Sequence, residues 1–348
     1  MLIQRRILGA YRVSPLPLNL IGVNMLYPIK VNSKYGFIDS EGRIVISPQY
    51  DFAYPFYCER AIVFQGDKAG VINDKDELVI PFYFHKNTIY YRFSENMVFV
   101  ENQGFFDHLG NLKIRIADYS SSLFINGYAP ICKSISTGHS VFNRIFHWGM
   151  IDYLGNIVIP VSYDQIGFFS EGICPVCIKD KTNNHHPKIW GFINDKNEIV
   201  EGFKYGCWGG GFQEQLLAVW SMPQKKGYIN TNFQTVISYQ FQEAASFSES
   251  RAMVRDNNYN GYVGYCNSIG EICIPCKFSH ANSFSDGLAV VCQKRKWGFI
   301  DKNGNFIIPP KFAGAFDFRN GIGSVLLNKS QQAYINKEGN IIFTCEIL

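Results

Sequence analysis

Two pairs of cysteines have the Cys-x-x-Cys spacing that structural zinc sites use. They are Cys174 with Cys177, and Cys273 with Cys276. Thiolates at this spacing bind Zn²⁺ when a second pair or histidines complete the set. Each pair, however, stands in a short apolar run with strand character, where residues three apart point to opposite faces. Because cysteine is also among the commonest buried residues, we expect these side chains to pack in the core, and we predict no metal and no cofactor.

Histidines and basic residues gather in two segments, residues 134–147 and 180–189. Histidines could ligate a metal there, but His185 and His186 are adjacent and no obvious cysteine or carboxylate completes a set. We therefore interpret the segments as a partner-binding surface. Loops that are only solvated remain the alternative. The candidate binding residues are His139, Arg144, His147, Lys181, His185, His186 and Lys188.

Acidic residues recur in a Phe-Ser-(Glu/Asp)-Gly element and could be mistaken for a catalytic carboxylate pair. A group that recurs at regular intervals does the same structural work each time, so we expect these carboxylates to accept backbone hydrogen bonds at turns. An acidic ladder facing a ligand is the alternative. The sequence holds no supported set of nucleophile and base, and we predict that the protein is not an enzyme. The recurring acids are Glu59, Glu95, Glu171, Glu214, Glu249 and Asp286.

The Phe-Ser-(Glu/Asp)-Gly element is part of a longer repeat with a period of about 35 residues. Each copy has Gly, an aromatic or apolar residue, usually Ile, and then Asp or Asn. A turn rich in Gly and Asn follows, then an apolar strand with a Pro near its end, and later a short Ala-Val strand that leads into the next copy. The copies begin at Gly36, Gly70, Gly104, Gly149, Gly191, Gly227, Gly264, Gly298 and Ala333.

The repeat resembles the WG repeat, or KWG-type β-repeat, of many bacterial proteins. Its signature Trp-Gly stands at Trp148-Gly149, Trp190-Gly191 and Trp297-Gly298, and Tyr35-Gly36 carries another aromatic. Copies in register cover about residues 26 to 343. The resemblance implies an interaction module that has no common catalytic motif.

Each copy predicts three short strands in a meander, which must stack on its neighbours to bury its apolar surface. The Gly permits a close backbone approach or a bulge, the Asp or Asn accepts turn amides, and the Pro closes the third strand. We predict an all-β fold, an open, superhelical and solenoid-like array of about nine three-stranded units forming one domain over residues 26–348. Residues 1–25 are expected to form a cap or a tail.

The alternative architecture is a closed β-propeller. Three observations favour the open array. Nine units exceed the usual number of blades, and each unit supplies three convincing strands where a blade has four. The repeats also begin with the first strand of a unit and end with the last strand of a unit, so that no strand is left over to close a ring.

Composition excludes several classes of partner. The 33 basic residues are interspersed with 29 acidic ones for a net charge of +4, which argues against nucleic acid. No apolar run has the length of a signal-peptide core or a membrane span, so we expect a cytoplasmic protein with reduced cysteines and no membrane partner. Of the 54 aromatic residues, 23 recur in register, which indicates packing between units.

Two intervals between copies are longer than the rest, 45 and 42 residues. Both insertions fall between the Ala-Val strand and the Gly-Phe-Ile strand, and hence on the same edge of neighbouring units. We predict a non-enzymatic scaffold that binds another protein through an extended surface carrying these insertions. The alternative is a module that binds carbohydrate or cell-wall polymer through exposed aromatics such as Trp208, Trp220 and Tyr259.

Overall fold

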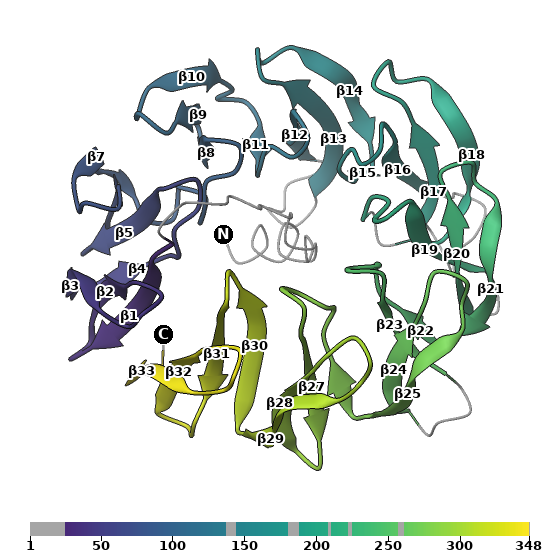
Figure 1. Cartoon of the computed structure of the whole chain (residues 1–348). Coiled ribbons are helices and arrows are strands. Elements are labelled where there is room, and N and C mark those ends of the chain that lie inside the picture. The colour runs from purple at the N-terminus through teal and green to yellow at the C-terminus, as the bar shows by residue number, and fades with distance from the viewer. Residues whose placement is uncertain are drawn as a thin grey trace. The chain divides into compact units, whose positions relative to one another are not determined.

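The computed structural model describes residues 25–136, 144–179, 188–207, 210–221, 225–256 and 261–347. Every regular element within these ranges is a β-strand, so the all-β prediction is confirmed. The strands form nine small antiparallel sheets that follow one another along the chain (Figure 1). By their contacts the residues divide into two compact units: unit 1 contains Tyr54–Phe212, and unit 2 contains Gly22–Ala53 with Gln213–Leu348.

We number the sheets 1 to 9 in chain order. Sheet 1 contains β1 (Tyr27–Val31), β2 (Lys34–Ile38) and β3 (Ile44–Tyr50). Sheet 2 contains β4 (Phe52–Ala53), β5 (Ala61–Gln65), β6 (Lys68–Ile72) and β7 (Leu78–His85). Sheet 3 contains β8 (Met97–Val100), β9 (Gly104–Asp107) and β10 (Leu112–Arg115).

Sheet 4 contains β11 (Ser120–Ser121), β12 (Tyr128–Ser136), β13 (Arg144–Asp152) and β14 (Ile157–Tyr163). Sheet 5 contains β15 (Gln165–Ile166), β16 (Cys174–Lys179), β17 (Lys188–Ile193) and β18 (Ile199–Tyr205). Sheet 6 contains β19 (Leu216–Ser221), β20 (Lys225–Asn230) and β21 (Thr235–Phe241).

Sheet 7 contains β22 (Glu243–Ala244), β23 (Ala252–Arg255), β24 (Val263–Cys266) and β25 (Ile272–Phe278). Sheet 8 contains β26 (His280–Ala281), β27 (Ala289–Gln293), β28 (Lys296–Ile300) and β29 (Phe306–Phe312). Sheet 9 contains β30 (Gly314–Arg319), β31 (Ile322–Leu326), β32 (Gln331–Ile335) and β33 (Ile341–Glu346).

The predicted three-strand meander is the main part of each sheet, but most sheets have a fourth strand. In sheet 8, for example, β26 pairs with β27 through His280 opposite Cys292 and Ala281 opposite Val291. The sequence did not predict these two-residue strands, because two residues are too few to show a periodic pattern. Four short antiparallel strands are what a propeller blade contains, so one of the observations that favoured the open array is removed.

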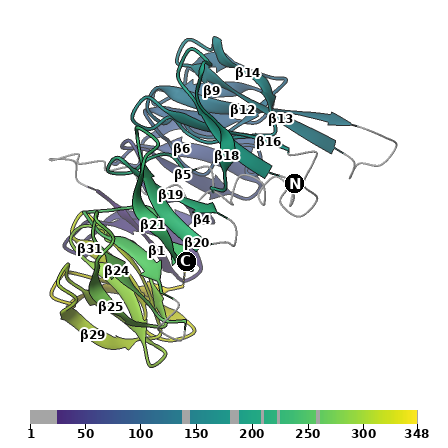
Figure 2. The same ribbon diagram turned by 90° about the vertical axis from the view of Figure 1, so that its right-hand side faces the viewer.

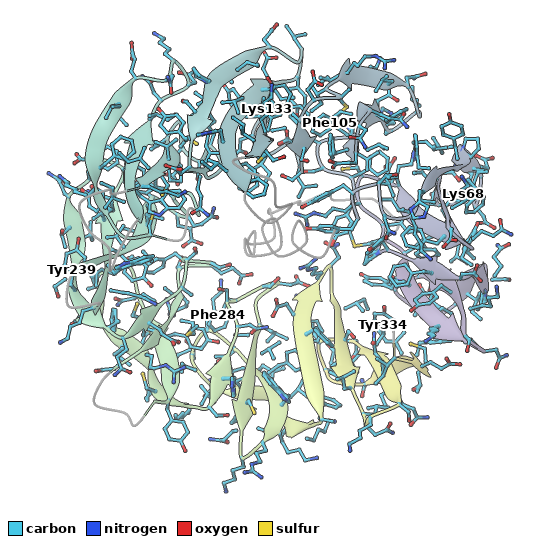
Figure 3. All side chains as sticks on the ribbon, turned by 180° about the vertical axis from the view of Figure 1, so that it is seen from behind. Lys68, Phe105, Lys133, Tyr239, Phe284 and Tyr334 are labelled. Atoms are coloured by element: carbon cyan, nitrogen blue, oxygen red, sulfur yellow. The ribbon has the colours of Figure 1, made fainter. Side chains whose placement is uncertain are left out.

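The first and last sheets meet in unit 2, where Figure 1 shows the purple β1 beside the yellow β33. The hydroxyl of the buried Tyr334, which is labelled in Figure 3, donates a hydrogen bond of 2.6 Å to the carbonyl of Pro28. The rings of Tyr27 and Tyr334 lie 5.7 Å apart. Both tyrosines belong to one core cluster with Ile29 of β1 and Ile322 of β31.

This junction repeats the contact that links consecutive sheets of unit 2. In each case the turn glycine between the last two strands lies against an isoleucine of the last strand of the sheet before it. The pairs are Gly270 on Ile237, Gly304 on Ile274, Gly339 on Ile308, and, from sheet 1 to sheet 9, Gly42 on Ile342.

The preferred prediction of an open, solenoid-like array was therefore wrong. Its main argument was that no strand is left over to close a ring, yet sheets 1 and 9 join by packing and need no shared strand. The nine sheets read as the blades of a β-propeller, the alternative prediction.

The glycine found in eight of the nine repeats allows two strands to approach, as predicted. In sheet 7, Val263 faces Phe278 and Tyr265 faces Ile274, so the single residue Gly264 lies opposite three residues, 275–277. A Cβ at Gly264 would lie 2.3 Å from the carbonyl oxygen of Ile274. Only glycine fits at such a distance, because side-chain carbon cannot overlap backbone oxygen.

The prolines do not end the third strand, contrary to the prediction. β25 continues beyond Pro275 to Phe278, and β29 continues beyond Pro309 to Phe312. Each proline occupies the bulge opposite the glycine, where the ladder is already interrupted and a missing N–H costs no hydrogen bond. Both prolines are solvent-exposed.

The Asp or Asn that closes each repeat motif accepts turn amides, as predicted. In sheet 4, Oδ1 of Asp152 accepts hydrogen bonds of 2.9 Å from the amides of Leu154 and Asn156. In sheet 5, Oδ1 of Asn194 accepts from Lys196 and Glu198 at 3.1 and 2.9 Å. Aspartate and asparagine therefore do the same work, since both supply the same acceptor oxygen.

The four aspartate turns predict a pH dependence of stability. Partial burial alone would raise the pKa of each carboxyl, but hydrogen bonds from the turn outweigh it, and the pKa of Asp39, Asp107, Asp152 and Asp301 lies below its ordinary value of 3.8. A folded-state pKa below the unfolded value stabilises the fold above pH 3.8, and this stability is lost as the pH falls through the folded-state value.

We expect the urea midpoint to fall between pH 7 and pH 3, and to fall less in a variant with asparagine at all four aspartate positions. Asparagine already serves at this position in sheet 5, so the variant keeps its turns. Asp74→Asn, at an exposed position, is the matched control and should fall like the unmodified chain. If the urea midpoint of the four-asparagine variant falls as far as that of the unmodified chain, these carboxylates do not cause the pH dependence of stability.

Candidate partner-binding surface

Hairpin β12–β13 of sheet 4 is much longer than its equivalents. It pairs nine residues, from Tyr128 opposite Asp152 to Ser136 opposite Arg144, whereas β27 and β28 of sheet 8 pair five. In sheet 5 the equivalent hairpin β16–β17 reaches Lys179 opposite Lys188. Both hairpins join equivalent strands of consecutive sheets in unit 1. Residues 137–143 and 180–187, which complete the two predicted insertions, lie outside the described residues.

The outer part of hairpin β12–β13 stands apart from its sheet. On one side β11 pairs only as far as Cys132, and on the other side β14 pairs only as far as Trp148. Within the described residues, no third strand pairs with residues 144–147. The two strands consequently extend past their neighbours in unit 1 (Figure 2).

One face of this outer part combines an apolar pair with a polar pair. Ile135 faces Ile145, and next to them Lys133 faces His147. Ile135 and Ile145 are 48% and 37% exposed, so the cross-strand pair presents apolar surface to solvent. The Lys133 ammonium lies 5.7 Å from the ring centre of Tyr119. In the described part of the chain, Nδ1 of His147 is buried and has no hydrogen-bond partner.

Hairpins β12–β13 and β16–β17, together with the residues between their strands, are rich in basic residues. Residues 129–151 and 174–193 contain five Lys or Arg and a single acidic residue, which equals the net charge of +4 of the whole chain. The amide of Lys179 donates to Asp164 at 2.8 Å, and its ammonium lies 3.8 Å from the same carboxylate. No carboxylate lies within ion-pair distance of Lys133 among the described residues.

The predicted binding residues are only partly placed. His147 lies in β13, Arg144 begins β13 and Lys188 begins β17. Lys133, Ile135 and Ile145 were missed, because residues 131–135, Ile-Cys-Lys-Ser-Ile, lack the strict alternation of apolar and polar residues that indicates a half-buried strand. His139, Lys181, His185 and His186 lie outside the described residues.

The cysteines at metal spacing are packing residues, as predicted. Cys174, Cys177 and Cys276 are buried, and Cys273 is half-buried. Burial raises the pKa of the Cys174 and Cys276 thiols, which disfavours the thiolate that a metal binds. No disulfide joins any of the ten cysteines. No group of three or more His, Cys, Asp or Glu that could hold a metal ion occurs in the ranges the structure describes.

The recurring acids bridge neighbouring sheets at their turns. Glu95 accepts the amide of Asn126 at 2.7 Å, Glu249 accepts the amide of Gly287 at 3.1 Å, and Glu214 accepts the amide of Ser250 at 2.9 Å. In each pair the acid belongs to one sheet and the amide to the next. The prediction that these carboxylates accept turn amides is confirmed for them.

Sheet 2 departs from this pattern, because a cysteine takes the place of the acid. The bridge between Tyr57 and Arg60 aligns Cys58, rather than Glu59, with Glu95 of sheet 3. The backbone amides of Glu95 and Asn96 approach the Cys58 sulfur, while burial raises the pKa of the thiol. The prediction that Glu59 is one of these acceptors was therefore wrong. The equivalent position is occupied by Cys58, one residue earlier.

The aromatics proposed for glycan binding receive little support. Trp220 is half-buried in β19. Trp208 and Tyr259 lie outside the described residues. Most aromatics of the repeat fill junctions between sheets instead. Phe105 packs on Phe124, and Phe299 on Phe318, with ring centres 4.7 and 4.8 Å apart.

Nine small sheets built from one repeated sequence, joined within each unit by turn contacts and aromatic pairs, define a tandem-repeat β-protein with propeller-type blades. The chain belongs to the WG-containing repeat family, as its sequence predicts. The matching segments are residues 35–68, 70–104, 148–181, 227–259, 264–297 and 297–329.

Comparison with solved structures concerns the fold alone. The chain is similar to a crystal structure of the eukaryotic initiation factor, with a TM-score of 0.54 and 9% sequence identity over 93% of this chain and 96% of that one. It is also similar to BamB from Moraxella catarrhalis, with a TM-score of 0.39 and 8% identity over 92% and 91% of the two chains. No curated protein matches it. The described residues include no helix able to span a membrane.

Proposed function

We propose that the protein is a non-enzymatic scaffold that binds another protein through hairpin β12–β13, with hairpin β16–β17 of the next sheet as a second contact. The observation that supports this proposal is the exposed pair Ile135 and Ile145 on a hairpin that extends past its sheet. Exposed cross-strand isoleucines are costly to leave in water, and a partner that covers them gains their burial.

The repeat architecture supports the same function. Within unit 1, packed sheets form a framework, and such frameworks carry binding residues on segments that extend from them. The family contributes no catalytic motif. The positive charge of the hairpins would speed association with an acidic partner and orient it.

The test is affinity capture from the native host with the double substitution Ile135→Ser and Ile145→Ser. Both side chains are exposed, so the fold should be retained. Loss of a buried isoleucine from an interface costs about 1–2 kcal/mol, and we expect the partner to be lost or at least about tenfold weaker.

The matched control is Ile199→Ser, which removes an isoleucine that is 61% exposed in β18 of the same unit. This variant should capture the partner like the unmodified chain. If the double variant captures the same proteins in the same amounts, the hairpin is not the binding surface.

A further inference from the structure

We infer that the partner adds an extended, acidic segment as a β-strand along the outer edge of β13. This inference rests on the proposed function and specifies the kind of partner that the hairpin binds. Three properties of residues 144–147 carry it: an edge without a neighbouring strand, the absence of a blocking residue, and the charge of the hairpin.

The first property is the edge itself. Residues 144–147 pair with β12 on one side only, within the part of the chain that the structure describes. Successive residues of a strand direct their N–H and C=O to alternate sides, so two of these four residues present donors and acceptors away from β12. An extended peptide gains main-chain hydrogen bonds at such an edge.

The second property distinguishes this edge from four other edge strands. The last strands of sheets 2, 4, 7 and 8 carry exposed prolines, namely Pro81, Pro160, Pro275 and Pro309. Proline and the bulge around it prevent another strand from pairing there. Residues 144–147 contain no proline and no acidic residue, and their ladder to β12 has no register shift. The edge of β13 is therefore regular where these edges are interrupted.

The third property is charge. Residues 129–151 include Lys133 and Arg144 and no acidic residue. Lys133 is exposed and has no carboxylate within ion-pair distance in the described ranges, whereas the exposed Lys34 lies 2.6 Å from Asp51. A strand that brings glutamate or aspartate next to this hairpin supplies the missing counter-charge.

The face of the hairpin sets the side-chain pattern of the added strand. Ile145 is exposed on the same face as Lys133 and His147. Neighbouring side chains on one face of a sheet pack together, so an apolar or β-branched residue is favoured beside Ile145, with acidic residues near the polar pair. Four residues at about 3.3 Å each span about 13 Å, so a short segment is sufficient.

The experiment measures fluorescence anisotropy of the full chain with a labelled peptide of alternating Glu and Val. Two further versions of the peptide carry N-methyl groups on alternate residues, each version blocking one edge. We expect the unmodified peptide and one methylated version to bind, and the other version to bind at least about tenfold more weakly, because a strand is added through a single edge.

Two comparisons separate strand addition from simple attraction of charge. A Lys-Val peptide and single-stranded oligothymidylate should both bind at least about tenfold more weakly than Glu-Val. Lys133→Glu should weaken the Glu-Val peptide, whereas Lys296→Glu, at an exposed lysine in β28, should leave it unchanged. Equal binding of both methylated versions, equal binding of oligothymidylate, or no binding of any peptide would overturn the inference.

The outcome is distinguishable from failure of the proposed function. If capture from the host depends on Ile135 and Ile145 but the peptides fail these tests, the hairpin binds a partner by another mode, and only strand addition is wrong. If capture does not depend on the isoleucines, the hairpin itself is excluded as the surface.

Discussion

Replacing Phe284 with alanine is expected to lower the free energy of unfolding by about 3–5 kcal/mol, the range for deleting a buried aromatic side chain. Phe284 is 1% exposed, and its ring centre lies 4.9 Å from that of Tyr265 in the preceding sheet. Its carbonyl accepts a hydrogen bond of 2.7 Å from the hydroxyl of Ser248 (Figure 3). The substitution therefore leaves a cavity at the junction between sheets 7 and 8.

The measurement is the urea midpoint of unfolding, with Phe316→Ala as control. Phe316 lies in β30 of the same unit but is 54% exposed, so its loss should change stability by less than about 0.5 kcal/mol. Similar effects of the two substitutions would mean that the aromatic junctions do not hold the sheets together. A buried phenylalanine occupies the equivalent position in other sheets: Phe56, Phe93, Phe124, Phe169, Phe212, Phe247 and Phe318.

Replacing Gly149 with alanine is expected to destabilise the protein by about 2–3 kcal/mol, although it adds one methyl group. The new Cβ would lie 2.5 Å from the carbonyl oxygen of Ile159 and 2.9 Å from the carbonyl carbon of Pro160. Both contacts are with backbone, so relief requires β13 and β14 to separate. Gly149 does not have a positive φ, so the expected loss of stability comes from these close contacts and not from backbone strain.

Gly202→Ala is the matched control for this substitution. Gly202 lies in β18 of the same unit, and no atom lies within 4 Å of the position that a Cβ would take. We expect no loss of stability, or a gain of about 0.4–1 kcal/mol from the stiffer unfolded chain. Thermal or urea unfolding of both variants checks the contrast. If Gly149→Ala is as stable as Gly202→Ala, the approach of the strands is not a constraint of the repeat.

The repeat could be predicted from sequence wherever one residue type has one physical role. Glycine opposite a bulge and Asp or Asn at a turn are determined by short contacts within a single unit, so their recurrence in the chain was sufficient. The architecture could not be predicted in the same way. It depends on the two-residue fourth strands, which have no sequence signal, and on packing between residues such as Pro28 and Tyr334, which are 306 positions apart.

The candidate surface was predicted in position but not in composition. Insertions at equivalent points of consecutive repeats must lie on one edge, and that argument needs only the register of the copies. Sequence length could not show that the first insertion lengthens β12 and β13 rather than forming a loop. Ile135 and Ile145 were consequently overlooked. The substitution of Cys58 for an acid was missed because the neighbouring Glu59 also fits the pattern by type.

The junction between sheets 1 and 9 shows that adjacent sheets need no covalent connection. No linker joins Pro28 to Tyr334 directly, yet the hydrogen bond between them is buried and short. Side-chain packing and turn contacts of the kind found between consecutive sheets are sufficient there. It follows that cleavage of a linker between two other sheets of unit 2 should leave the two fragments associated, so the chain can be nicked, or divided into separately produced pieces that reassemble, without loss of the fold.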